Sequence, residues 1–127
     1  MSDEGVPVPD AILELAEALF DLAREGKIDL LDHIRAGVPV NLLDVNGNSF
    51  LMLAAYHAHT DLVAGLLELG ANPNLANDRG QTPLAGAVFK RARAVVDGLL
   101  AAGANPDLGE PSAREAASMF GFELGGK

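Results

Sequence analysis

Residues 66–74 read LLELGANPN and residues 99–107 read LLAAGANPD, so nearly the same nine residues are written twice. The second copy begins 33 residues after the first. A period of this length is typical of stacked arrays, in which each unit buries its apolar face on its neighbours. The repeated stretch therefore predicts a stack of similar units.

The repetition covers whole units, because residues 44–76 align with residues 77–109 without a gap. In the second unit Thr82 precedes Pro83, a pair typical of a helix N-terminus. The Thr82 hydroxyl can accept a hydrogen bond from a backbone N–H of the first helical turn. Proline is tolerated at the first helical position, because the N–H that it lacks would have no partner within the helix. Ser49 stands in the same capping place in the first unit. Each unit is therefore expected to begin with a short helix.

A second helix is expected in each unit, since apolar residues recur there at helical spacing. Gly70 and Gly103 follow these two helices directly, where a left-handed residue commonly ends a helix. The apolar positions are Leu62, Val63, Leu66 and Leu67 in one unit and Val95, Val96, Leu99 and Leu100 in the other.

Gly65 and Gly98 occupy equivalent places inside these second helices. Glycine there lowers helix stability by about 0.5–1 kcal/mol relative to alanine. We expect that only a small residue fits at both places against the neighbouring unit. Close approach of a partner or of a second copy to the outer face is the alternative.

The chain resembles the ankyrin repeat family in four stretches, GNSFLMLAAYHAH (47–59), LVAGLLELGANPN (62–74), GQTPLAGAVF (80–89) and VVDGLLAAGANPD (95–107). The resemblance implies an all-α fold, a solenoid of stacked helix-turn-helix units with short β-turn fingers. Met52 and Ala85 stand where the family usually places histidine, so one hydrogen-bonded side chain between repeats is missing.

The resemblance is partial on both sides of residues 44–107. Upstream it implies a first repeat with a lengthened first helix. Downstream, PSAREAASMFG (111–121) is similar to the first helix of a further repeat, capped by Ser112. The implied organisation is a flexible segment 1–9, a single ankyrin-repeat domain 10–121 and a tail 122–127, with repeats at about 10–43, 44–76 and 77–109 and a half-repeat at 110–121.

Ankyrin repeats are protein-binding scaffolds, so the resemblance implies a non-catalytic scaffold that binds another protein. The family binds through its finger tips and the concave side of its first helices. Interface centres favour aromatic residues and arginine, which makes Tyr56, Phe89 and Arg79 the strongest candidates. Carried onto this sequence, the partner-facing residues are Val45, Asn46, Asn48, Tyr56 and His57 in one unit and Asp78, Arg79, Gln81, Phe89 and Lys90 in the next.

Two alternatives to these assignments stay open. Tyr56 and Phe89 recur at one repeat spacing and predict a short aromatic stripe, but they could instead fill gaps between stacked helices. Lys90, Arg91 and Arg93 form the one basic cluster of the sequence. Such charges are commonly solvated at a helix turn, and the alternative is a docking point for an acidic segment of a partner.

Composition narrows the class of protein further. The net charge is −9, with 11 acids and 3 bases in residues 1–64 against 7 and 6 in residues 65–127. A negative protein repels phosphate backbones, so nucleic-acid binding is disfavoured. The acidic start lacks the features of a signal peptide, and no apolar stretch is long enough to span a membrane. With no cysteine present, we expect a soluble, cytoplasmic protein.

Metal, cofactor and enzyme chemistry are not expected. On a helix, His57 and His59 would face different ways, and His33 lies in another repeat. The sequence holds no cysteine nucleophile, no Gly-x-Ser-x-Gly turn and no phosphate loop. An enzyme is therefore disfavoured, and no cofactor is expected.

The carboxyl end lacks the second helix that would complete a family cap. Met119, Phe120, Phe122 and Leu124 are crowded there, although an array needs a polar outer cap. We expect the tail to fold back and seal the end with Phe122 and Leu124, which leaves a monomer. A homodimer, or a self-associating subunit that pairs through this end, is the alternative.

Overall fold

The structure is a computed structural model that describes residues 10–124. The predicted segment 1–9 and the last three residues of the predicted tail lie outside the described residues. Between positions 10 and 124 the chain forms the helices α1 (Asp10–Glu25), α2 (Asp29–Arg35), α3 (Phe50–Tyr56), α4 (Thr60–Glu68), α5 (Pro83–Phe89), α6 (Arg93–Ala101) and α7 (Ala113–Phe120).

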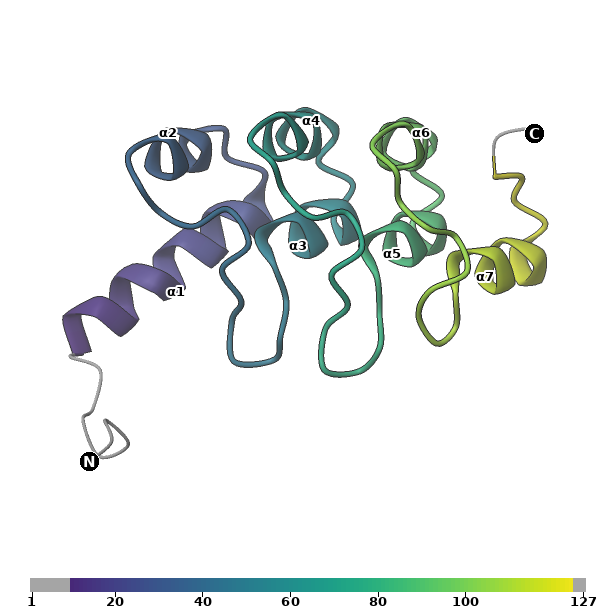
Figure 1. Ribbon diagram of the computed structural model, residues 1–127, viewed down its shortest axis with the longest axis horizontal. Coiled ribbons are helices and arrows are strands. Elements are labelled where there is room, and N and C mark those ends of the chain that lie inside the picture. The colour runs from purple at the N-terminus through teal and green to yellow at the C-terminus, as the bar shows by residue number, and fades with distance from the viewer. Residues whose placement is uncertain (1–9, 125–127) are drawn as a thin grey trace.

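The helices form two layers (Figure 1). The inner layer contains α1, α3, α5 and α7 side by side, and the outer layer contains α2, α4 and α6. Hairpin-like fingers project from the stack between the helix pairs. Within the described part of the chain, β-structure is limited to two isolated bridges, Leu43 with Ser49 and Gly109 with Ser112. The predicted all-α stack with short fingers is confirmed.

The inner helices begin where the capping residues predict. Ser49 Oγ accepts from Met52 N–H at 3.0 Å, and Thr82 Oγ1 accepts from Ala85 N–H at 3.2 Å. Ser112 forms a full capping box with Glu115. Its Oγ atom accepts from the Glu115 backbone N–H at 3.1 Å, and its own backbone N–H donates to the Glu115 carboxylate at 2.9 Å. Each such cap contributes about 1 kcal/mol to stability. The caps thus fix the start of α3, α5 and α7.

The core is made mostly of leucine, alanine and valine, because the inner helices pack closely. Helix α3 lies between α1 and α5, and Phe50, Ala54 and Ala55 are fully buried there. The rings of Phe20 and Phe50 join the first two repeats, with their centroids 4.6 Å apart. A buried leucine or phenylalanine contributes about 1.5–3 kcal/mol, so packing between neighbouring repeats contributes substantially to stability. No helix within residues 10–124 has the length and apolar character needed to cross a membrane.

Asparagine side chains fix how far each repeat is shifted against the next. Asn41 Oδ1 accepts from the backbone N–H of Asn72 at 2.8 Å. One repeat later, Asn74 Oδ1 accepts from the backbone N–H of Asn105 at 2.7 Å. The same bond is therefore made twice at the repeat spacing, and its donors Asn72 and Asn105 are matching positions of the two similar stretches. A slip of one residue would break both bonds.

Gly65 and Gly98 differ in their surroundings, although the sequence places them alike. A Cβ atom at Gly65 would lie 2.4 Å from Leu31 Cδ1 of the preceding repeat. A Cβ atom at Gly98 would meet nothing within 4 Å among the described residues, because Ala64 stands one repeat after Leu31. The expectation that only a small residue fits is correct for Gly65 and wrong for Gly98.

The carboxyl end folds back over the last repeat. Phe120, Phe122 and Leu124 are half-buried and pack against the core. The Arg93 guanidinium lies 4.4 Å from the centre of the Phe122 ring, and it donates to the carbonyl oxygen of Glu123. Arg91 lies over Phe120 at 5.4 Å. Arg91 and Arg93, two of the three residues of the basic cluster, therefore contact the carboxyl-terminal segment of the same chain. This agrees with the expectation that the tail covers the last repeat.

We predict opposite effects for the same substitution at the two equivalent glycines. Gly98→Ala should raise the free energy of unfolding by about 0.5–1 kcal/mol, because alanine favours the helix and the site is open. Gly65→Ala should lower it by about 1–3 kcal/mol, because Leu31 must move out of its packed position. Urea denaturation of both variants measures the difference, and equal effects would contradict the packing described.

Candidate functional site

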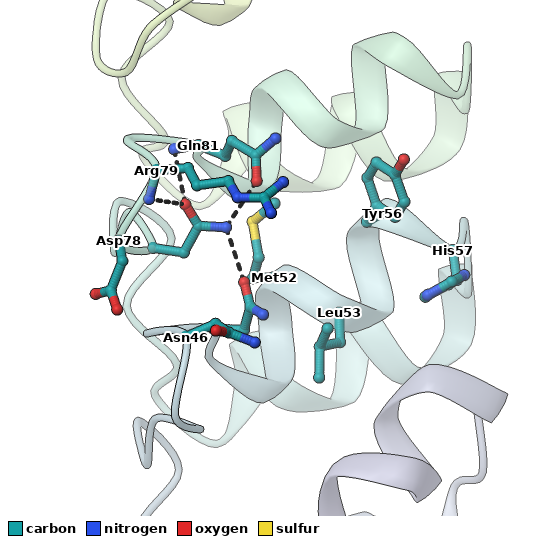
Figure 2. Close-up of a pocket in the computed structure, with 10 residues that line it drawn as sticks. Asn46, Met52, Leu53, Tyr56, His57, Asp78, Arg79 and Gln81 are labelled. Carbon is teal, nitrogen blue, oxygen red and sulfur yellow. Dashed lines mark hydrogen bonds between the residues drawn. The ribbon is translucent and has the colours of Figure 1, made fainter.

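A shallow groove of about 380 Å³ lies between two neighbouring fingers and α3 (Figure 2). We call it the finger groove. Both finger tips and the exposed end of an inner helix contribute to it, so two stretches of the chain, residues 46–57 and 77–81, meet there. Its lining residues are Asn46, Asn48, Met52, Leu53, Tyr56, His57, Asn77, Asp78, Arg79 and Gln81.

The side-chain amide of Asn77 holds the wall of the groove together. Its Oδ1 atom accepts from the backbone N–H groups of Arg79 and Gln81, each at 3.0 Å. Its Nδ2 atom donates to Asn48 Oδ1 and to Gln81 Oε1, each at 2.8 Å (Figure 2). One side chain thus shapes its own finger and joins it to the preceding one, so the groove is formed before anything binds.

The preceding finger is shaped by the same device. Asp44 Oδ1 accepts from the backbone N–H of Asn46 at 2.8 Å and from that of Asn48 at 2.9 Å. A backbone bond from Asp78 N–H to the Asn46 carbonyl, 3.0 Å long, then links the two finger tips. Short polar side chains that accept from the residues after them are typical of tight turns. Asp44 and Asn77 stand 33 residues apart, so the device follows the repeat.

The floor of the groove is apolar. Met52 and Leu53 are buried, and the Tyr56 ring, 39% exposed, lies beside them. A Cβ atom at Gly86 would lie 3.4 Å from Tyr56 Cδ1, so the tyrosine ring packs on the glycine of α5. Tyr56 therefore fills a gap between helices with one side of its ring and leaves part of its surface accessible.

Phe89 lies in an adjoining hollow that shares Met52, Tyr56 and Gln81 with the finger groove. Its ring is 45% exposed and meets the Phe120 ring edge-on, with the ring centres 5.2 Å apart. The two aromatic residues thus both pack and remain accessible, which combines the two readings that the sequence left open.

The charged side chains that lie over the groove and its Tyr56 ring are basic, and the acidic side chain of Asp78 points away from the groove. In Figure 2 the Arg79 guanidinium lies over the groove beside Gln81, and the Asp78 carboxylate points away from it. Asp78 Oδ1 is instead packed on Gly47, where a Cβ atom would approach it to 2.5 Å. Lys90 Nζ lies 4.8 Å from the centre of the Tyr56 ring. Across residues 10–124, neither Arg79 nor Lys90 forms an ion pair.

The histidines do not lie as the sequence suggested. Helix α3 ends at Tyr56, so His57 and His59 are in the following loop, where their rings stack with centres 6.1 Å apart. The prediction that they face different ways is wrong, because it assumed a continuing helix. His59 Nε2 lies 2.6 Å from the Arg24 carbonyl oxygen and ties this loop to α1. In residues 10–124, no group of three or more His, Cys, Asp or Glu side chains is placed to hold a metal ion.

The pKa of His57 is lowered from its ordinary value of 6.5. Partial burial is the largest cause, followed by the positive charges of His59, Lys90 and Arg24. Because the folded protein favours the neutral imidazole, this group stabilises the fold above pH 6.5, and that stabilisation is lost as the pH falls through the lowered pKa. Burial and, to a lesser degree, three neighbouring positive groups therefore act together on the pKa of His57 at this helix end.

The structure brings most of the sequence-predicted residues together. Seven of the ten line the finger groove, Phe89 lies in the adjoining hollow, and Lys90 lies over the Tyr56 ring. Val45, 94% exposed, is at a finger tip outside the groove lining. Sequence reasoning missed Met52, Leu53 and Asn77.

Comparisons with known proteins agree with the repeat architecture. A family model described as ankyrin repeats in three copies matches residues 19–109. The chain is 44% identical over 61 residues to an ankyrin repeat protein of Pseudomonas aeruginosa. That aligned segment covers 45% of this chain and 36% of the bacterial protein. It is also 45% identical over 67 residues to the human oxysterol-binding protein-related protein 1. That aligned segment covers 50% of this chain and 7% of the human protein. The chain thus matches well under two thirds of the length of either relative.

We predict that Asn77→Asp lowers the free energy of unfolding by about 1–3 kcal/mol, because two donated hydrogen bonds are lost and a carboxylate faces two amide oxygens. Asn74→Asp is the matched control. It makes the same change of charge but keeps the Oδ1 acceptor for Asn105 and loses only a 3.5 Å contact to the Gly103 carbonyl. Urea denaturation compares the two, and an equal loss would show that Asn77 does not hold the fingers together.

We predict that His57 titrates below 6.5 in a histidine NMR titration, and that Lys90→Gln raises its midpoint without restoring the ordinary value. Removing Lys90 takes away one of the positive charges, whereas burial and His59 remain. Arg35→Gln, on the outer layer, should leave the midpoint unchanged. A midpoint at or above the ordinary value would contradict the positive surroundings of this group.

Proposed function

Because the chain belongs to the ankyrin repeat family, we propose that it binds a partner protein through the finger groove and carries out no chemistry of its own. Ankyrin repeats are protein–protein interaction modules, and the groove is where this chain presents partly exposed aromatic residues inside a polar rim. The observation that carries the proposal is the Asn77 network, which sets the rim residues in place in the absence of a partner.

The physical character of the groove supports this function. Tight interfaces centre on a few aromatic or arginine side chains with a polar surround. Tyr56 and Arg79 line the groove, and Phe89 continues the aromatic surface toward α7. The Tyr56 ring packs on Gly86, and the Phe89 ring meets the Phe120 ring, so these two aromatic side chains lose little conformational entropy when a partner covers them.

Self-association through the carboxyl end has less support. Phe122 and Leu124 are half-buried against the chain's own core, and Arg93 holds the segment in place. Met119, 63% exposed, is the large apolar side chain that stays accessible on α7. We therefore infer a monomer. We also infer a cytoplasmic protein, in keeping with the absence of cysteine. Residues 10–121 are proposed to form one ankyrin-repeat domain with repeats at about 10–43, 44–76 and 77–109 and a half-repeat at 110–121.

The test is a capture experiment with matched variants. Wild type, a Tyr56→Ala/Arg79→Ala/Phe89→Ala variant and an outer-layer Arg35→Ala/Glu68→Ala variant are each used as bait in lysate of the source cell. We predict a protein that wild type and the outer-layer variant retain and the triple variant loses. Thermal unfolding confirms that each bait is folded.

With that protein purified, titration calorimetry should show a dissociation constant at least about 100-fold weaker for the triple variant, since two or three central side chains are removed. A partner that the triple variant retains as well as wild type does would contradict binding at the groove.

A further inference from the structure

We propose that the finger groove recognises a short partner segment in which an apolar side chain is flanked on both sides by carboxylates. The proposal rests on the function proposed above and deepens it by naming the chemistry of the bound segment. It depends on three features of the groove: a cation near each end, an apolar surface near them, and polar amides along the rim.

The two cations come from different elements. Arg79 is on the second finger and lies over the groove, and Lys90 follows α5, with its Nζ atom 4.8 Å from the centre of the Tyr56 ring. Within the described residues both lack an acidic partner, unlike Arg24, Arg35, Arg93 and Arg114. An arginine binds a carboxylate through two parallel hydrogen bonds, and a lysine binds one as a point charge.

The surface near the two cations includes apolar groups. Met52 and Leu53 form the floor, and the accessible sides of the Tyr56 and Phe89 rings continue it. A leucine, isoleucine, methionine or phenylalanine side chain can be covered there. Asn46 and Gln81 on the rim carry amide groups, which can bond to the backbone of a bound segment whatever its side chains are.

The negative charge of the whole protein does not oppose this arrangement. Asp78 is the one acid among the lining residues, and its carboxylate is packed on Gly47 and points away from the groove. Asp44 Oδ1 accepts from the rim residues Asn46 and Asn48, but its Oδ2 atom is paired with Arg24 at 3.7 Å. Most other acids of the described residues lie on α1 and the outer layer. At physiological salt, exposed charges more than about 8 Å apart are largely screened. The nearby cations therefore decide which segment fits, and a basic segment would place like charges together.

Selection from a phage library of random 12-residue peptides tests the proposal. The baits are wild type, Arg79→Gln/Lys90→Gln, and Lys27→Gln/Arg35→Gln, which removes one arginine and one lysine elsewhere. Wild type should enrich peptides with Asp or Glu on both sides of a large apolar residue. The best such peptide, made synthetically, should bind Arg79→Gln/Lys90→Gln about tenfold more weakly at 0.05 M salt, since each exposed ion pair contributes up to about 1 kcal/mol. The loss should shrink at 0.5 M salt, and Lys27→Gln/Arg35→Gln should bind like wild type.

The peptides that are selected test two claims separately: that the groove binds a partner, and that the bound segment is acidic. Peptides that need Tyr56 and Phe89 but are neutral or basic would leave the groove as a binding site and overturn the acidic segment. Peptides that bind the Tyr56→Ala/Arg79→Ala/Phe89→Ala variant as well as wild type would overturn the groove itself.

A second copy of this chain offers related chemistry, because α1 exposes Ile12 and Leu13 between Asp10 and Glu14. Sedimentation of wild type over a range of concentrations distinguishes that occupant. An increase in mass that Arg79→Gln/Lys90→Gln abolishes would show that another copy of this chain occupies the groove, and the proposal of a different partner would be overturned.

Discussion

The structure depends on burial between repeats, because each helix pair in residues 10–124 packs its apolar face against a neighbouring pair or helix. Helix α3 is covered by α1 on one side and α5 on the other, and Phe50, Ala54 and Ala55 on α3 are fully buried. Stability is then a sum of contacts between neighbouring repeats, which hold only while the repeats keep one register. Asn41 and Asn74 hold that register by the same bond, made once per repeat.

The finger groove follows from the same register. Once two repeats are fixed side by side, the amide of Asn77 can reach across to Asn48 while it shapes its own finger. The alanines and glycines that let the inner helices approach also leave room for the Tyr56 ring on Gly86. Stacking therefore supplies a rigid, partly apolar groove, and the identity of the partner depends on the few side chains that the stack leaves accessible.

The repeat, the caps at Ser49, Thr82 and Ser112 and the all-α fold could be predicted because each depends on residues close in sequence. Contacts between repeats could not. Gly65 and Gly98 have the same place in sequence, yet only Gly65 faces a leucine of the preceding repeat. The helix pattern did not reveal that α3 ends before His57, so the stacking of His57 on His59 was missed. The repeated Asp44 and Asn77 were the signal for the finger network, but the partners of Asn77 needed the folded chain.

The most direct test of the account is photo-cross-linking in the source cell from two positions. A photoreactive amino acid replaces Asn46 on the rim of the finger groove in one variant and Glu68 on the outer layer in the other. We expect a protein cross-linked from position 46 and absent from position 68. A protein cross-linked from position 68 and not from position 46 would place the binding surface on the outer layer and contradict the account.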